Sequence, residues 1–180
     1  MLVRILAAAV GLPLLLGIVI LLPPVATAIL FAVACMIGAY EMLWRTGLLR
    51  HKRILAYTAL MAAATVMWSW LKGTGIVSEQ TLWITALTAL FVFFTALFCE
   101  LLAGHTKLQF SSLAAPLFSG VIYPFLIGAL VRLRCMDGGV FFIITAFVLS
   151  MIADTGAYFV GRACGKHKLA PVISPKKTVE

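Results

Sequence analysis

The sequence predicts an all-α integral membrane protein, a polytopic bundle of about six transmembrane helices with a cytoplasmic N-terminus. Of its 180 residues, 63% are hydrophobic and only 11% are charged. A soluble domain of this size cannot bury that much apolar surface in its core, so the soluble classes are excluded. Two further observations agree: the apolar residues form runs of membrane-spanning length, and most basic residues lie in alternate loops, on one side of the membrane.

The apolar runs define the expected spans. A bilayer core about 30 Å thick is crossed by roughly 20 helical residues. Runs near that length occur at residues 5–22, 25–43, 54–71, 81–103, 110–131 and 139–158. Pro23 and Pro24 separate the first two runs. The first run is long for a signal peptide, and apolar sequence continues past the Ala-Thr-Ala at 26–28, so we expect it to remain as a helix.

The loop charges predict the orientation. Basic residues gather in the loop 44–53 and in the segment 159–180, and Arg4 and Lys107 fall on the same side of the membrane. Cytoplasmic loops are enriched in Lys and Arg, so this side is predicted to be cytoplasmic. The chain therefore divides into a transmembrane bundle, residues 1–158, and a cytoplasmic basic segment, residues 159–180.

Three carboxylates lie inside the expected spans: Glu41, Glu100 and Asp154. A charge in lipid is costly, so each is a candidate functional residue. Each lies near the end of an even-numbered span, which places all three at the cytoplasmic leaflet, where they could converge on Mg²⁺ or another divalent cation. The alternative for Glu41 and Glu100 is a simple interfacial role, or pairing with a loop base such as Arg45 or Lys107.

Asp154 has neighbours that favour function over that alternative. Ser150, Asp154 and Tyr158 are four residues apart, so they share one helix face. This face is polar in an otherwise apolar helix, and we expect it to look into a protein interior or a water-filled cavity.

The residues after Asp154 are of the types that bind phosphate. Glycines there would allow unusual backbone angles and let amides approach an anion, and basic side chains would add positive charge. In chain order the set is Gly156, Gly161, Arg162, Gly165, Lys166, Lys168, Ser174, Lys176, Lys177 and Thr178. Taken alone, the bases are also explained by the ordinary charge of a cytoplasmic loop or by anchoring to anionic lipid.

The segment 153–180, ADTGAYFVGRACGKHKLAPVISPKKTVE, closely resembles the central segment of bacterial phosphatidate cytidylyltransferases, the CDP-diacylglycerol synthases. Members of that family read Asp-Thr/Ser-Gly-Ala-Tyr, then Gly-Arg, Gly-Lys, Leu-x-Pro and Ser-Pro-Lys-Lys-Thr-x-Glu. Upstream the resemblance is looser and rests on the layout of spans and on Tyr40-Glu41 at the end of the second one.

The resemblance implies that CTP and phosphatidate react to give CDP-diacylglycerol and pyrophosphate, with a divalent metal, at the cytoplasmic face of a bacterial inner membrane. Asp154 would carry the metal, with Glu41 and Glu100 as further candidates. Asp154, Lys176 and Lys177 would be catalytic. The substrate phosphates would be held by Gly156, Gly161, Arg162, Lys166, Lys168, Ser174 and Thr178.

The same resemblance sets expectations about the whole protein. Membrane lipid is an expected partner, nucleic acid is not, and a homodimer is an alternative left open. Family members carry a C-terminal signature with Lys-Arg, Lys-Asp, His-Gly-Gly and a final Asp-Arg-x-Asp that does not occur in this sequence. We therefore expect the chain to be the N-terminal portion of a synthase that needs the rest for activity.

Two other classes of function are compatible with the composition. One is a non-enzymatic membrane protein, either a lipid-binding bundle or a small transporter. A transporter would place its carboxylates near the bilayer midplane, however, whereas these lie near helix ends. The other is a CTP-dependent lipid kinase, which shares the membrane layout and the nucleotide.

Overall fold

The computed structural model describes residues 2–104, 110–170 and 174–179, and the side chains of all of these except 2–8, 110–111 and 175–176. The chain forms two compact units, Met1–Val140 and Phe141–Glu180. In order, the elements are α1 (Leu2–Leu21), α2 (Pro24–Tyr40), η1 (Glu41–Arg45), α3 (Lys52–Thr74), α4 (Glu79–Ala103), η2 (Phe110–Leu113), α5 (Ala114–Leu117), η3 (Phe118–Ile122), α6 (Tyr123–Cys135), α7 (Gly139–Cys164), β1 (Lys168–Ala170) and β2 (Ser174–Thr178).

Helices of membrane-spanning length confirm the predicted fold class. Among the described residues, five continuous helical segments are long and apolar enough to cross a bilayer: Pro24–Arg45, Lys52–Thr74, Glu79–Ala103, Ala114–Cys135 and Gly139–Cys164. They correspond to the second to sixth predicted spans. The first predicted span is α1, in which the described apolar stretch covers Ala9–Leu21. The protein is therefore a polytopic helical membrane protein.

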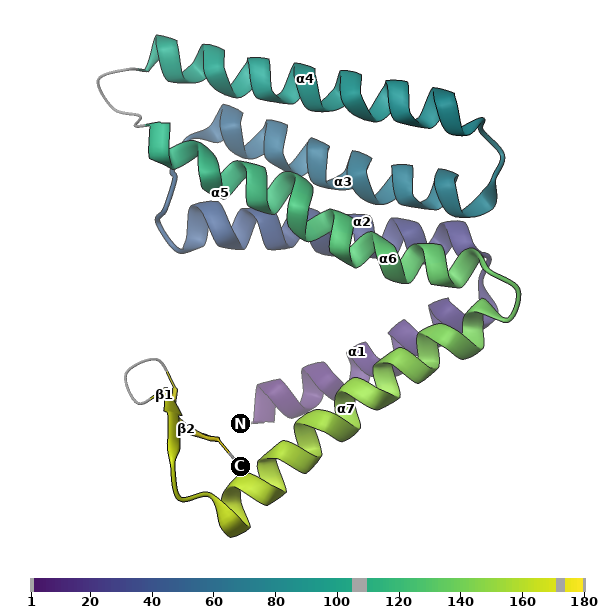
Figure 1. Cartoon of the computed structure of the whole chain (residues 1–180), viewed down its shortest axis with the longest axis vertical. Helices are drawn as coiled ribbons and strands as arrows, with labels where there is room; N and C mark the ends of the chain where they lie inside the picture. The colour runs from purple at the N-terminus through teal and green to yellow at the C-terminus, as the bar shows by residue number, and fades with distance from the viewer. Residues whose placement is uncertain (1, 105–109, 171–173, 180) are drawn as a thin grey trace. The chain divides into compact units, whose positions relative to one another are not determined.

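Helix α3 is the centre of the first unit. It packs against α2, α4 and α6, and Figure 1 shows it lying between α4 and α2. Helices α3 and α6 cross very closely at Gly128. A Cβ atom built on this glycine would lie only 2.8 Å from Cβ of Ser69. Small residues at such crossings let membrane helices approach backbone to backbone. Ser69 is fully buried there and accepts a hydrogen bond from Nη1 of Arg132 at 2.8 Å.

The break between α1 and α2 is stabilised by a residue far along the chain. Pro24 starts α2 and cannot donate a backbone hydrogen bond to the preceding turn. Arg134 of α6 instead donates from Nε to the carbonyl of Val19 at 2.9 Å and from Nη2 to the carbonyl of Leu22 at 3.0 Å. The guanidinium thereby satisfies carbonyls at the C-terminal end of α1, which an isolated helix leaves without partners.

The fifth span is not a regular α-helix. A π-helical turn, η3, joins α5 to α6, with Pro116 before it and Pro124 just after it. Proline lacks the N–H that would continue the hydrogen-bond ladder, so a local change of helical winding at this point is expected physically.

The second unit consists of most of α7 and a short β-hairpin. Helix α7 continues past its predicted end at residue 158 to Cys164. Strands β1 and β2 then pair antiparallel, with Lys168 opposite Thr178 and Ala170 opposite Ser174. The sequence prediction treated residues 159–180 as a basic segment without assigned secondary structure, so the hairpin is an addition to the predicted fold.

Candidate functional site

Asp154 lies on a polar stripe that runs along α7. The predicted stripe of Ser150, Asp154 and Tyr158 is extended by Arg162, which is again four residues on and shares the face. Nη1 of Arg162 donates a hydrogen bond to the Tyr158 hydroxyl at 3.3 Å. All four side chains are exposed, and no described residue pairs with the Asp154 carboxylate. Asp154 and Arg162 are two turns apart, which is about 12 Å along the helix axis.

The hairpin packs against the end of α7 through glycine. A Cβ atom on Gly161 would lie 3.0 Å from Oγ1 of Thr178, and one on Gly165 would lie 2.7 Å from both Oγ1 and Cγ2 of that residue. Gly165 also donates its N–H to the Gly161 carbonyl at 3.2 Å. The absence of side chains at these two positions therefore lets β2 approach the helix end.

These glycines do not have the backbone angles expected from the sequence. Among the described residues, positive φ occurs only at Gly47, Gly75 and Gly138. Gly156 and Gly161 are helical, and beyond the helix's own backbone no atom of the described residues lies within 4 Å of a Cβ built on Gly156. The expectation of unusual backbone angles at Gly156 and Gly161 was therefore wrong, because α7 extends through this part of the motif. Their role in holding phosphate stays a prediction.

The basic and hydroxyl residues of the motif are distributed over the hairpin. Lys168 in β1 and Lys177 in β2 are exposed, while Ser174 and Thr178 are half-buried. Side chains alternate along a strand, so Lys177 projects from the face opposite Thr178 and away from the glycines. Lys166 and His167 each have an interaction partner within the protein. The side chain of Lys176 lies outside the described residues.

Glu41 has the simple pairing that the sequence left open. Its Oε1 accepts from Nη1 of Arg45 at 3.1 Å, one helical turn away, and both side chains are mostly exposed, at 55% and 75%. Exposed pairs of this kind contribute little to stability. Arg45 is one of the loop bases that the sequence offers as a partner for Glu41, and the structure contains this pair.

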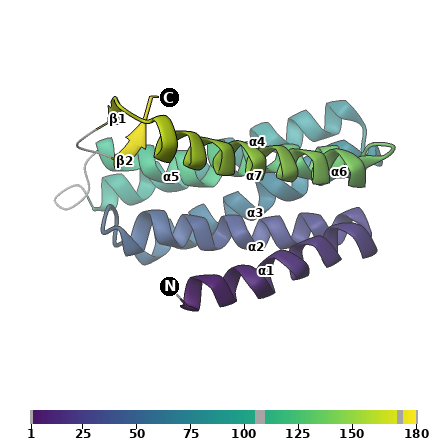
Figure 2. The ribbon, with the colours of Figure 1, turned by 90° about the horizontal axis from the view of Figure 1, so that it is seen from below.

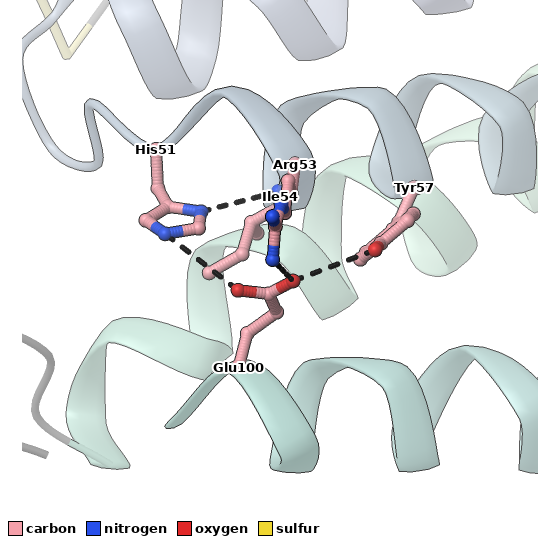
Figure 3. Close-up of polar contacts among 5 residues, drawn as sticks. All are labelled: His51, Arg53, Ile54, Tyr57 and Glu100. Atoms are coloured by element: carbon pink, nitrogen blue, oxygen red, sulfur yellow. Dashed lines mark hydrogen bonds and ion pairs between the residues drawn. The ribbon is translucent and has the colours of Figure 1, made fainter. Parts of the chain in front are cut away.

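Glu100 lies in a more enclosed network with the start of α3, shown in Figure 3. Only 12% of its side chain is exposed. Oε1 accepts from the Tyr57 hydroxyl at 3.4 Å and lies 3.6 Å from Nη1 of Arg53, while Oε2 lies 3.7 Å from Nε2 of His51. The carboxylate thus has cationic and hydroxyl partners at the C-terminal end of α4, where the helix dipole is unfavourable to a negative charge.

His51 connects this network to the helix it begins. It is the N-cap residue of α3, and its Nδ1 accepts the Ile54 N–H at 3.5 Å while Nε2 faces Glu100. The sequence prediction did not assign His51, Arg53 or Tyr57 to any site. The available signal was that the 44–53 loop and the end of the fourth span lie on the same membrane side, but the pairing depends on how α3 and α4 pack.

We expect Glu100→Gln to destabilise the first unit by about 1 kcal/mol, because it removes the charged acceptor from a largely enclosed network while Arg53, itself well exposed, keeps access to water. Thermal unfolding in detergent measures the effect. Glu41→Gln is the matched control and should change stability by less than about 0.5 kcal/mol, since its pair is exposed. Equal unfolding temperatures for the two variants would contradict the inferred stabilising role of the Glu100 network.

The acidic residues differ in how well they suit a divalent metal. No group of three or more His, Cys, Asp or Glu side chains gathers in the part of the chain that the structure describes. Glu41 and Glu100 are already paired with arginine. Asp154 fits as a single ligand, because Mg²⁺ is commonly held by one or two carboxylates, with water and substrate phosphates completing its coordination. Convergence of the three acids stays a prediction.

A sequence model described as the Cytidylyltransferase family matches residues 2–180, nearly the whole chain. The chain belongs to the cytidylyltransferase family. Its match to individual family members is more local. A phosphatidate cytidylyltransferase of Staphylococcus saprophyticus is 50% identical over 54 residues, which are 30% of this chain and 21% of that protein.

Other staphylococcal cytidylyltransferases match in the same way. The phosphatidate cytidylyltransferase of Staphylococcus haemolyticus is 57% identical over 42 residues, and that of Staphylococcus aureus is 55% identical over 42 residues. Each of these matches covers 23% of this chain and 16% of the relative. The matched segments therefore span about a fifth or less of the length of the relatives. No solved structure matches the chain significantly.

Proposed function

We propose that this protein takes part in transferring CMP from CTP to phosphatidate, giving CDP-diacylglycerol and pyrophosphate at the cytoplasmic face of a bacterial inner membrane. Family membership and the local likeness to phosphatidate cytidylyltransferases support the proposal. The observation that carries it is the second unit. A carboxylate with no partner among the described residues shares one face of α7 with a guanidinium, and a lysine-bearing hairpin packs on the end of that helix.

The reaction needs little covalent chemistry from the protein. A phosphate oxygen of phosphatidate attacks the α-phosphorus of CTP, the new P–O bond forms, and the bond to the β-phosphate oxygen breaks with its electron pair leaving on pyrophosphate. Both substrates are anions, so the protein must hold them close together against their repulsion. Positioning and charge neutralisation are then the main sources of rate enhancement.

The exposed residues of the second unit are suited to that task. Arg162 offers a fork of N–H donors that matches phosphate oxygens, and its bond to Tyr158 limits the positions of the side chain. Lys168 and Lys177 add charge from the two strands. Asp154 and Arg162 are about 12 Å apart along the helix axis. The hydrogen bond to Tyr158 directs the Arg162 guanidinium back toward Asp154, so the two side chains could act on one nucleotide.

Asp154 would be the metal-holding residue. When bound there, Mg²⁺ would neutralise charge on the phosphates and polarise the phosphorus–oxygen bonds. The carboxylate suits this role because it has no competing partner among the described residues. It also lies on the helix face that carries Arg162, two turns further along α7.

Membranes that contain the protein test the proposal directly. Supplied with CTP, Mg²⁺ and phosphatidate, they should form CDP-diacylglycerol in proportion to the amount of protein, and omission of phosphatidate should abolish the product. Absence of CDP-diacylglycerol above the level of membranes lacking the protein would contradict it and favour a lipid-binding bundle without enzymatic activity.

A further inference from the structure

A groove lies in the first unit, between α2 and α3 at the end where the 46–51 loop joins them. Figure 2 shows the two helices running side by side. The groove has a volume of about 590 Å³, which is within the range of known ligand sites. We call it the α2–α3 groove, and its lining residues are Met36, Ile37, Tyr40, Trp44, Lys52, Leu55, Ala56 and Ala59.

The lining residues form two facing stripes. On α3 they recur at intervals of three and four residues, which is the spacing of one helix face, and those on α2 and η1 follow a similar spacing. Two alanines on the α3 side, Ala56 and Ala59, leave the space that larger side chains would fill. Ile37 on the other side is 55% exposed. Because these helices are of membrane-spanning length, an exposed apolar groove here is open to lipid chains rather than to water.

One end of the groove is lined by amphipathic and charged side chains, unlike the apolar rest of it. Tyr40, 45% exposed, and Trp44 lie at the end of the α2 segment, and Lys52 is the first residue of α3. Tyr and Trp are favoured at the membrane–water interface, where one end of the ring is apolar and the other wet. The mouth of the groove therefore lies at headgroup level, and its floor lies at acyl-chain level.

The charges at this end are not balanced. Glu41 pairs with Arg45, and Glu100 interacts with His51 and Arg53. Both of these acids, which the structure describes at this end of the first unit, are thus engaged, yet no described acid pairs with Lys52, which is exposed beside the groove. A fixed cation above an apolar groove matches an anionic headgroup above an acyl chain.

We infer that the α2–α3 groove binds phosphatidate, with one acyl chain along Ile37, Leu55 and Ala59 and the phosphate at Lys52. The choice of this lipid rests on the proposed function. The lipid's phosphate has no further headgroup attached, so an ammonium at the mouth can reach it directly. The groove would supply the lipid substrate from the leaflet in which the reaction takes place.

Photocrosslinking tests the inference in membranes that contain the whole protein. The probe is phosphatidate carrying a diazirine on one acyl chain. We expect the label in peptides covering residues 36–59, and we expect competition by unlabelled phosphatidate but not by an equal amount of phosphatidylcholine. Lys52→Gln should lower labelling about fivefold, the effect of losing one basic residue at a lipid surface. Ala56→Phe, which fills the groove, should lower labelling to the level seen under competition.

Two control variants keep the outcome clear. Lys52→Arg retains the cation and should retain labelling. Ala64→Phe places the same large side chain on α3 in a different groove, beside Trp68 and Trp83, and should label like the unaltered protein. Unchanged labelling in both Lys52→Gln and Ala56→Phe, label confined to other peptides, or equal competition by phosphatidylcholine would overturn the inference.

The readout separates this inference from the proposed function. Labelling is measured without CTP, so it does not depend on turnover. Groove-specific labelling without CDP-diacylglycerol formation would support the lipid site and refute the enzymatic proposal. Product formation, together with labelling that the groove substitutions leave unchanged, would refute the lipid site alone.

Discussion

Replacing Asp154 with asparagine is expected to lower CDP-diacylglycerol formation at least about 100-fold, the scale of losing one group that stabilises transition-state charge. The substitution keeps the shape of the side chain and removes its charge. Asp154 is exposed and no described residue pairs with it, so its loss should leave folding and membrane insertion intact. Initial rates with saturating CTP and phosphatidate measure the effect, and membrane-fraction yield measures insertion.

The matched control is Asp137→Asn. Asp137 is also an exposed aspartate, but it lies in the turn between α6 and α7 and outside the polar stripe. Its replacement should leave the rate unchanged. Normal activity in Asp154→Asn would rule out the metal-holding role, and an equal loss in both variants would show that the effect is not specific to the stripe on α7.

Gly128→Val should destabilise the first unit by roughly 1–3 kcal/mol, the usual cost of overpacking a close contact. The added Cβ would clash with Oγ of Ser69 and lie 2.8 Å from its Cβ, so α3 and α6 would have to separate. Separation would also break the hydrogen bond from Arg132 to Ser69. Thermal unfolding in detergent should show the loss.

Gly17→Val is the control for the loss of a helical glycine. Gly17 lies in α1, and beyond its own helix backbone no atom of the described residues lies within 4 Å of a Cβ built there. The same substitution therefore meets open space and should leave the unfolding temperature nearly unchanged. An equal decrease in the two variants would contradict the inferred close crossing of α3 and α6.

Much of the fold could be predicted because membrane spans are specified by local composition. A run such as 25–43 must be helical in a bilayer, since every backbone polar group there needs an internal partner. The contacts that hold the bundle together were not predictable in the same way. Arg134 capping the end of α1 joins residues more than a hundred positions apart, and no local pattern encodes that pairing.

The candidate site was predicted in part. The i, i+4 spacing of Ser150, Asp154 and Tyr158 specifies a helix face regardless of tertiary packing, and the structure extends that face to Arg162. The expectation of unusual backbone angles at the glycines failed for a physical reason. A glycine can permit an unusual backbone angle or can let another segment approach closely. At Gly161 and Gly165 the structure shows the second, because Thr178 lies close to both and neither has a positive φ. The pairing of Glu100 with α3 likewise depends on packing that the sequence does not encode locally.

The most direct test of cytidylyl transfer uses CTP labelled at one phosphate at a time. Membranes containing the protein are incubated with phosphatidate, Mg²⁺ and CTP that carries radioactive phosphorus in either the α or the γ position. Transfer of CMP predicts label in the lipid fraction from the α position only, with the γ label recovered as pyrophosphate. Lipid labelled from the γ position would reveal a CTP-dependent lipid kinase, and lipid labelled from neither would show that the protein does not transfer any part of CTP; either result would contradict the proposed function.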